Sequence, residues 1–259
     1  MRDFLSKILP KQGAATRACC FHFGRCGSTL LGNMLAAHPQ MEWKGEVFHA
    51  FHERADRSAA VKPFQMLEQL IAHSKYPHFG FETKFQHLDS NGLNLRLESY
   101  LSELKKLGFG KLIILRRQNL LRQAISVARG QATQKWHVSS KKQKPEMGLI
   151  ELDIANVSLG GKNRHLLDCF KFLEQTYLDA SRLFARLEWD CLQICYEKDL
   201  QQNPFDGYKL AVDYLGVPLV RPEISLQKLE SRPIEKIVSN YSQLRECLRG
   251  TEYEWMYEQ

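Results

Sequence analysis

The sequence contains no run of about 18 apolar residues, the length that a membrane-spanning helix needs. Its first segment, MRDFLSKILPKQG, has positive charges and a proline inside any apolar stretch, so we expect neither a signal peptide nor a membrane anchor there. No internal repeat and no low-complexity tract interrupts the chain. These absences predict a cytoplasmic protein without a membrane span.

Cysteine occurs without the spacing of a zinc module. The count of seven is odd, and two pairs lie close together in apolar segments, Cys19 with Cys20 and Cys191 with Cys195. Adjacent cysteines of one strand do not pair easily, so this usage is typical of a reducing compartment in which cysteine acts as a small hydrophobe. The histidine-rich stretch HAFHE departs from the H-E-x-x-H pattern and lacks a third ligand, so no metal site is predicted.

Length and composition are those of an ordinary globular domain. The chain has 259 residues, of which 44% are apolar and 25% charged, enough for one domain with a full hydrophobic core. The net charge of +7 favours an anionic partner, either nucleic acid, phospholipid or a small phosphorylated ligand. A solvated surface with a surplus of lysine would give the same charge, so charge alone does not decide between them.

Apolar periodicity alternates between that of strands and that of helices. Strands are expected at 17–23, 80–85, 111–117 and 191–197, and helices at 28–37, 61–74, a stretch ending at Gly108, 120–136 with Asn119 as its cap, 163–187 and 203–216. Such alternation builds βαβ units around a buried parallel sheet. We therefore predict an α/β fold, a three-layer α/β/α sandwich related to P-loop NTPases. A single domain is expected over 1–259, with its core at about 17–255 and an N-terminal extension at 1–16.

The stretch FHFGRCGSTLLGNML has the outline of a phosphate-binding loop between a strand and a helix. Gly24 and Gly27 would let the backbone approach an anion, and Ser28 and Thr29 would add hydroxyl donors at a helix N-terminus. A nucleotide triphosphatase loop would place a lysine before the serine, and a later strand would end in a magnesium-binding aspartate. Both are missing, and the strand at 111–117 ends in two arginines instead.

Two further alternatives concern the same loop. A cysteine-based phosphatase would have an arginine six positions after its nucleophile, whereas Gly32 stands six positions after Cys26. A plain glycine turn between a strand and a helix remains open on this stretch alone.

The stretch LIILRRQNLLRQAIS supplies a second group of anion-binding side chains. Arg116 and Arg117 stand at the carboxyl end of a predicted parallel strand, the edge at which such sheets bind ligands. On the following helix Arg122, Ser126 and Arg129 are spaced to share one face. Because a guanidinium binds phosphate with two hydrogen bonds and a serine hydroxyl adds a third, Arg117 with Ser126 is predicted to hold a phosphate. Arg129 is expected to be solvated.

Together, GRCGSTLLGNML and LRRQNLLRQAIS resemble the sulfotransferase family, particularly its bacterial carbohydrate-type enzymes. The segments ARGQATQKWH, YEKDLQQNP and SNYSQLRECLRGTEYEW are similar to family segments in the same order, so the resemblance extends over about 17–255. Two departures are Cys26, where family loops often have serine, and one extra residue between the arginine pair and Ser126. The second departure leaves Arg116 as an alternative to Arg117.

The resemblance implies a donor and the residues that bind it. The donor of the family is 3′-phosphoadenylyl sulfate, used without a metal ion. The first motif would hold its 5′-phosphosulfate through Gly24, Arg25, Cys26, Gly27, Ser28 and Thr29. The second would hold its 3′-phosphate through Arg117 and Ser126. Arg25 would supply positive charge where a nucleotide triphosphatase uses its loop lysine.

The resemblance also implies catalytic residues. Lys84, at the end of the strand-like segment GFETKF, is similar in place to an active-site lysine of several relatives, although an exposed lysine after a strand is equally plausible from the sequence. The pair Gly45-Glu46 is similar to the family's G-E pair, whose glutamate is the general base. A free glutamate has a pKa near 4.3, so His49 and His52 are rivals for this role.

The predicted function is transfer of a sulfuryl group to a hydroxyl of a carbohydrate, a glycolipid or another small molecule. The variable loops 40–60 and 137–162 are expected to bind this acceptor, the second as an irregular loop over the site. One alternative is a P-loop-like nucleotide kinase. The other is a basic module for nucleic acid or polyanions, which would interleave aromatics with a stripe of lysine and arginine. The arginines cluster at strand ends instead, so no nucleic-acid partner is expected; the oligomeric state stays open.

Overall fold

The computed structural model describes residues 15–49, 51, 62–89, 92–133, 148–223 and 232–258. The chain divides into two compact units, each described separately. The first comprises Met1–Arg116 and Tyr177–Ile224, and the second comprises Arg117–Thr176 and Ser225–Gln259. The division falls within the continuous helix α7, Leu166–Arg186. The predicted extension 1–16 lies almost wholly outside the described residues.

A sheet of five parallel strands forms the centre of the first unit. Its order is β2-β3-β1-β4-β5, with the strands β1 Arg17–His22, β2 Met41–Glu46, β3 His78–Lys84, β4 Lys111–Arg116 and β5 Asp190–Cys195. The inner strands are buried over nearly their whole length, as the continuous apolar run of β4 predicts for that strand. Parallel strands share one carboxyl edge, so the ends of β1, β2 and β3 lie next to one another.

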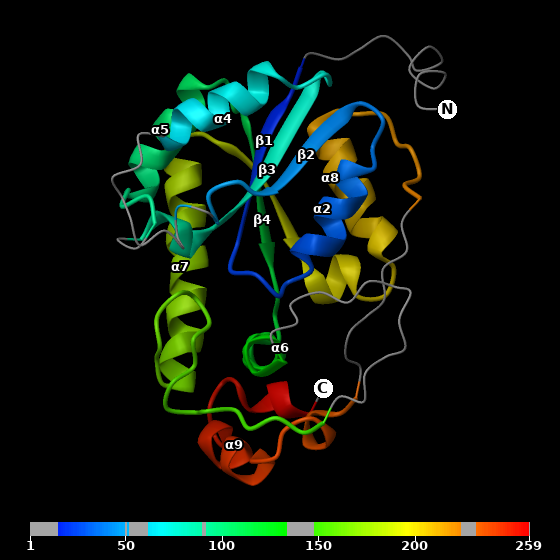
Figure 1. Ribbon diagram of the computed structural model, residues 1–259. Helices are drawn as coiled ribbons and strands as arrows, with labels where there is room; N and C mark the ends of the chain where they lie inside the picture. The colour runs from blue at the N-terminus through cyan, green and yellow to red at the C-terminus, as the bar shows by residue number, and fades with distance from the viewer. Residues whose placement is uncertain are drawn as a thin grey trace. The chain divides into compact units, whose positions relative to one another are not determined.

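Three helices cover one face of the sheet: α4 Pro63–Ala72, α5 Leu97–Lys106 and the carboxyl half of α7 (Figure 1). Aromatic side chains fill this layer, where Phe21 of β1 packs at centroid distances of 5.4–5.9 Å against Phe85, Tyr100 and Phe184. Phe85 belongs to the short helix η1, Phe85–Leu88, which directly follows β3. Burial of these rings contributes to the stability of the layer.

Helices α2 Ser28–Ala36 and α8 Pro204–Leu215 cover the other face (Figure 1). Apolar residues of both helices pack with side chains of β1, β2, β4 and β5 in one buried cluster, including Leu31, Met34, Trp43, Ile113 and Tyr208. Asn203 caps α8 by accepting a hydrogen bond from the backbone of Phe205, and Gly216 ends the helix in the left-handed conformation. The two helical layers and the sheet confirm the three-layer α/β/α prediction.

The second unit contains α6 Leu120–Thr133, the amino half of α7, α9 Tyr241–Leu248 and the short helices η3 Ile234–Lys236 and η4 Glu254–Tyr257. Asn119 caps α6 as predicted, since its Oδ1 accepts a hydrogen bond of 2.9 Å from the backbone of Arg122. The Asn119 amide also donates to the carbonyl of Met256 at 2.9 Å, so one side chain fixes α6 against η4.

The sequence patterns place four of the five strands and miss β2. Each predicted strand is present within about two residues of its expected bounds, and helices follow them as expected. Strand β2, MEWKGE, lies at the sheet edge and buries only Met41 and Trp43 strongly, so its apolar pattern is too short to mark a strand. The predicted irregular segment 137–162 is described only from residue 148 onwards.

Candidate anion-binding site

The loop after β1 has the backbone conformation of an anion-binding turn. Gly24, Arg25 and Gly27 have φ angles of 80°, 55° and 92°, in the left-handed region that side chains disfavour. Helix α2 begins at Ser28 without an acidic residue in its first turn, so nothing there neutralises the positive end of the helix dipole. The backbone N–H groups in the first turn of a helix lack intrahelical acceptors, which makes this end suited to a phosphate or sulfate.

Helix η2, Tyr196–Leu200, packs closely against the loop and leaves no room at Gly27. A Cβ on Gly27 would lie 2.8 Å from the Tyr196 ring and 3.1 Å from Leu200. These residues belong to the YEKDL segment whose likeness to the sulfotransferases was noted in the sequence. η2 is a π-helix, a form that often occurs at functional sites. The glycine is therefore required both by its φ angle and by this contact.

Lys84, the last residue of β3, lies directly over the loop. A Cβ on Gly24 would stand 3.1 Å from Cε and 3.8 Å from Nζ of Lys84. The side chain is about one-fifth exposed. β1 pairs with β3 in parallel, and His22 is the Cα partner of Lys84, so strand pairing sets this placement. The structure thus gives the loop a lysine from a neighbouring strand.

Glu46, the last residue of β2, is directed towards Lys84 by a β-bulge. Lys44 pairs with Phe81 and Glu46 with Glu82, so the register shifts at Gly45; a regular strand would have put Gly45 opposite Glu82. Bulges re-aim side chains and are frequent beside active sites. The bulge falls on the Gly45-Glu46 pair that resembles the family's G-E pair.

Three nitrogen groups surround one carboxylate oxygen of Glu46. Its Oε2 lies 2.7 Å from Nζ of Lys84, 3.5 Å from Nε2 of His87 and 3.9 Å from Nδ1 of His49. The structure therefore brings together the three residues predicted to be catalytic, Glu46, Lys84 and His49, and adds His87. His52, the other predicted rival base, lies outside the described residues.

Sequence reasoning missed His87, which is 1% exposed in η1. Its Nδ1 accepts a hydrogen bond of 3.3 Å from the backbone N–H of Lys84. A neutral ring that accepts at Nδ1 carries its proton on Nε2, the atom that faces Glu46. The sequence signal for His87 was a histidine three residues after Lys84, which ends a predicted strand.

A second polar group, also missed, lies beneath the loop in the buried layer. Nδ1 of His22 accepts a hydrogen bond of 2.9 Å from the N–H of Gly24, and its Nε2 lies 3.2 Å from Oε2 of Glu82. The other oxygen of Glu82 accepts a hydrogen bond of 3.2 Å from the indole of Trp43. A Cβ on Gly32 would lie 2.1 Å from that oxygen, so only glycine fits in α2 at this point.

Burial by itself would lower the pKa of His22, but hydrogen bonding to Cys26 and Glu82 outweighs it and raises the pKa to about 10. The Gly24 N–H opposes this rise, because its bond needs the lone pair of Nδ1. The signal for these residues was a histidine and a glutamate inside otherwise apolar strands, FHF and GFETKF.

The six predicted loop residues differ in exposure. Cys26 is fully buried and packs into the apolar cluster under α2, Ser28 is 8% exposed, and Thr29 is exposed. Arg117 and Ser126 belong to the second unit, in which Ser126 lies on α6. On the same helix as Ser126, the guanidinium of Arg122 donates a hydrogen bond of 3.1 Å to the carbonyl of Arg232.

Two groups of side chains in the first unit are close enough to hold a metal ion. Their ligand atoms lie within 4.8 Å of one another; one group is Glu46, His49 and His87, and the other is His22, Glu46 and Glu82. His87 accepts a backbone N–H at Nδ1, so its neutral ring carries the proton on Nε2, the nitrogen that faces Glu46. A metal ligand needs a lone pair there. In this tautomer His87 has no lone pair on Nε2 for a metal ion.

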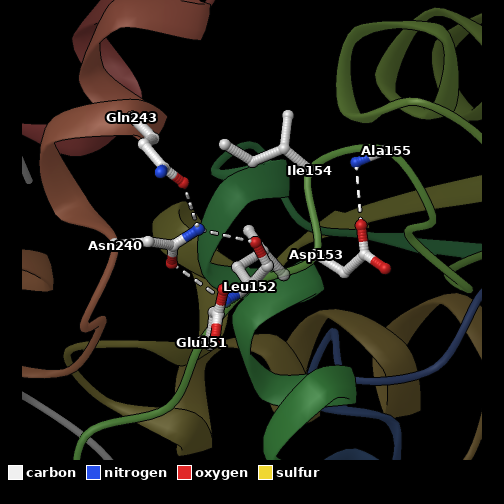
Figure 2. A pocket seen from close by; sticks show the side chains of 7 residues that line it. All are labelled: Glu151, Leu152, Asp153, Ile154, Ala155, Asn240 and Gln243. Carbon is white, nitrogen blue, oxygen red and sulfur yellow. Dashed lines mark hydrogen bonds between the residues drawn. The ribbon is translucent and has the colours of Figure 1, made fainter.

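The second unit contains a hollow of about 600 Å³ (Figure 2). Asn240 bridges one wall, since its Oδ1 accepts from the backbone of Leu152 at 3.1 Å and its Nδ2 donates to the carbonyl of Leu152 at 2.9 Å. Asp153 accepts hydrogen bonds from the backbone of Ala155 and Asn156 at 3.0 and 3.1 Å. These polar groups stabilise the wall itself, and the hollow includes none of the predicted site residues.

The described helices offer no candidate for a membrane span, because none combines sufficient length with sufficient apolar character. Compared with known protein families and with curated proteins, the sequence shows no significant match.

Proposed function

We propose that the protein is a sulfotransferase that moves the sulfuryl group of 3′-phosphoadenylyl sulfate to a hydroxyl of a carbohydrate, a glycolipid or another small-molecule acceptor. The observation that supports this most is one group of neighbouring features. The glycine loop leads into the N-terminus of α2, Lys84 lies over its first glycine, and the Glu46 carboxylate lies 2.7 Å from that lysine. An anion cradle beside a candidate base is what transfer of an anionic group to a hydroxyl requires.

Each group in the constellation has a role in this reaction. The acceptor oxygen forms a bond to sulfur while the bond between sulfur and the bridging oxygen breaks, and the electron pair leaves on the 5′-phosphate. The loop N–H groups, Ser28, Thr29, Arg25 and Lys84 stabilise that growing negative charge. Glu46 takes the hydroxyl proton, and the products are a sulfate ester and 3′,5′-adenosine bisphosphate. Arg117 with Ser126 is the proposed site of the 3′-phosphate, on the sequence resemblance alone.

A nucleotide kinase is the second candidate. It would share the loop but needs a magnesium ion held by an aspartate near the phosphates. The strand ends next to the loop present Glu46 and Lys84, and Glu46 is already paired with the lysine. β4 ends in Arg116. This charge pattern supports a metal-free transfer, so we expect activity to survive an excess of EDTA.

Ligand-induced thermal stabilisation tests the proposal. A ligand at a hundred times its dissociation constant adds about 2.7 kcal/mol to the free energy of unfolding. We expect 3′,5′-adenosine bisphosphate to raise the melting temperature without added metal, and ATP with Mg²⁺ to raise it much less. The reverse order would favour the kinase. Stabilisation by single-stranded oligonucleotides alone would favour the nucleic-acid module.

A further inference from the structure

We propose that His87 is a positioning residue, which holds the Glu46 carboxylate in the orientation needed to accept a proton from the acceptor hydroxyl. The inference rests on the proposed function and extends it to a residue without a predicted role. His87 lies in η1, three residues after Lys84, and its Nε2 is 3.5 Å from Oε2 of Glu46.

The orientation of the imidazole is fixed from the opposite side. The N–H of Lys84 donates to Nδ1, which selects the tautomer with the proton on Nε2. The ring is 1% exposed, so it cannot turn towards solvent without opening η1. His87 therefore presents its Nε2–H towards Glu46 from a fixed ring, whereas the longer Lys84 side chain lies near both Glu46 and the loop.

That difference matters because Lys84 also lies over the loop. An anion at the loop competes with Glu46 for the Lys84 ammonium, which is within reach of both. When Lys84 turns to the anion, the His87 N–H remains as a fixed donor to Oε2. The oxygen Oε1 of Glu46 is then directed to the acceptor. In the transfer step Oε1 receives the hydroxyl proton, and His87 keeps its own.

His87 does not itself meet the substrate in this arrangement. Its side chain is 1% exposed, against 23% for Glu46 and 49% for His49. A buried donor behind a partly exposed carboxylate acts through that carboxylate. Errors of about 1 Å in the position of a reacting group can cost roughly a hundredfold in rate.

Two substitutions separate this role from a purely structural one. His87→Asn places an oxygen near the position of Nδ1, so it retains the acceptor for the Lys84 N–H but loses the donor to Glu46. His87→Gln places an amide near the position of Nε2, so it retains the donor to Glu46. We expect His87→Asn to lower kcat by roughly tenfold to a hundredfold, with an unchanged KM for the donor and a loss of melting temperature too small to unfold the protein under assay conditions. His87→Gln should recover a large part of the rate.

A double-mutant cycle and a spectroscopic measurement complete the test. In a Glu46→Gln background, His87→Asn should cause no more than a twofold further loss, because the carboxylate that it orients is gone. The ¹⁵N spectrum of the wild-type imidazole should show a protonated Nε2, and Glu46→Gln should shift that signal. A His87→Asn variant with wild-type kcat, or one more active than His87→Gln, would overturn the inference.

The spectroscopic readout keeps this inference separate from the proposed function. If the wild-type protein neither binds 3′,5′-adenosine bisphosphate nor transfers a sulfuryl group, the proposed function fails. A protonated Nε2 that responds to Glu46→Gln would still support the orienting contact. The orienting contact would be rejected if the His87 ring were protonated on Nδ1, or if its ¹⁵N signal did not change in Glu46→Gln. Either result would hold even if the protein catalyses a different reaction.

Discussion

Lys84 joins the anion loop to the candidate base: its Nζ lies 2.7 Å from Oε2 of Glu46, and its Cε lies 3.1 Å from where a Cβ on Gly24 would stand. The three residues come from the ends of three strands that are adjacent in the sheet order β2-β3-β1. One ammonium is therefore near both the loop and a carboxylate. Under the proposed function, an anion bound at the loop would compete with Glu46 for this ammonium.

The first prediction concerns the base. Glu46→Gln preserves size and hydrogen bonding but cannot accept a proton, so kcat should fall about 10²–10⁴-fold with one working acceptor at saturating donor. The variant should bind 3′,5′-adenosine bisphosphate at least as well as the wild type, because a neutral amide attracts the Lys84 ammonium less strongly than the carboxylate does. His49→Ala serves as the comparison, since His49 is half exposed and its Nδ1 is 3.9 Å away. If His49→Ala is inactive while Glu46→Gln retains more than about a tenth of the rate, the two roles are reversed.

The second prediction concerns the donor 3′-phosphate and follows from the sequence resemblance. Arg117→Ala should weaken the binding of 3′,5′-adenosine bisphosphate by roughly 2–4 kcal/mol, the cost of losing a charged, bidentate contact. Isothermal titration calorimetry measures it, with Arg182→Ala as the control because Arg182 is exposed on α7 and carries the same charge. Equal affinity in both variants would remove Arg117 from the site.

The third prediction concerns Gly27. Gly27→Ala must adopt a φ of 92° and place its Cβ 2.8 Å from the Tyr196 ring. Gly216→Ala faces a positive φ of 70° but has no atom within 4 Å. Strain of this kind costs about 1–3 kcal/mol, so chemical denaturation should show that both variants lose stability and that Gly27→Ala loses more. Only Gly27→Ala should also weaken anion binding. If Gly27→Ala and Gly216→Ala lost the same stability and the same anion affinity, η2 would have moved to make room for the alanine.

The fourth prediction concerns pH and the buried histidines His38 and His78. Burial lowers the pKa of His38, and burial with the nearby His38 lowers that of His78. The unfolded chain therefore binds more protons just below about pH 6.5, and the stability that these neutral rings contribute above that pH is lost as the pH falls. His22, whose pKa is raised, acts in the opposite direction over the same range, so the loss is measured as the difference between the wild type and a variant, each unfolded at pH 7.5 and 5.5.

This effect is tested by replacing His38, with the exposed His73 as the control. His38→Gln can retain the hydrogen bond of 2.8 Å from Nε2 to the carbonyl of Pro218, yet cannot titrate. Its drop in stability between the two pH values should be smaller than that of the wild type, whereas His73→Gln, at an exposed site, should change nothing. An equal drop in all three proteins would show that His38 does not contribute to the acid sensitivity.

The sequence by itself determined the fold class and the loop. Strands such as KLIILR have continuous apolar runs and helices have a 3.6-residue period, so the α/β alternation can be recognised from neighbours in the chain. Gly24, Gly27 and Ser28 form the loop from six consecutive residues, and the Asn119 cap lies three residues before the N–H that it accepts. These are local relations, set by backbone sterics and helix ends.

Only the tertiary structure decided which side chains meet Glu46 and the loop. His22 and Glu82 are 60 positions apart, and Glu46 and His87 are 41 apart, yet each pair is brought within 3.5 Å. Their contacts depend on the strand order β2-β3-β1 and on the bulge at Gly45, which shifts the pairing by one residue. Strand order follows from the packing of whole layers, a sum over many distant contacts that no local stretch of sequence encodes. For that physical reason the sequence indicated the loop, whereas folding placed Lys84, Glu46 and His87 beside it.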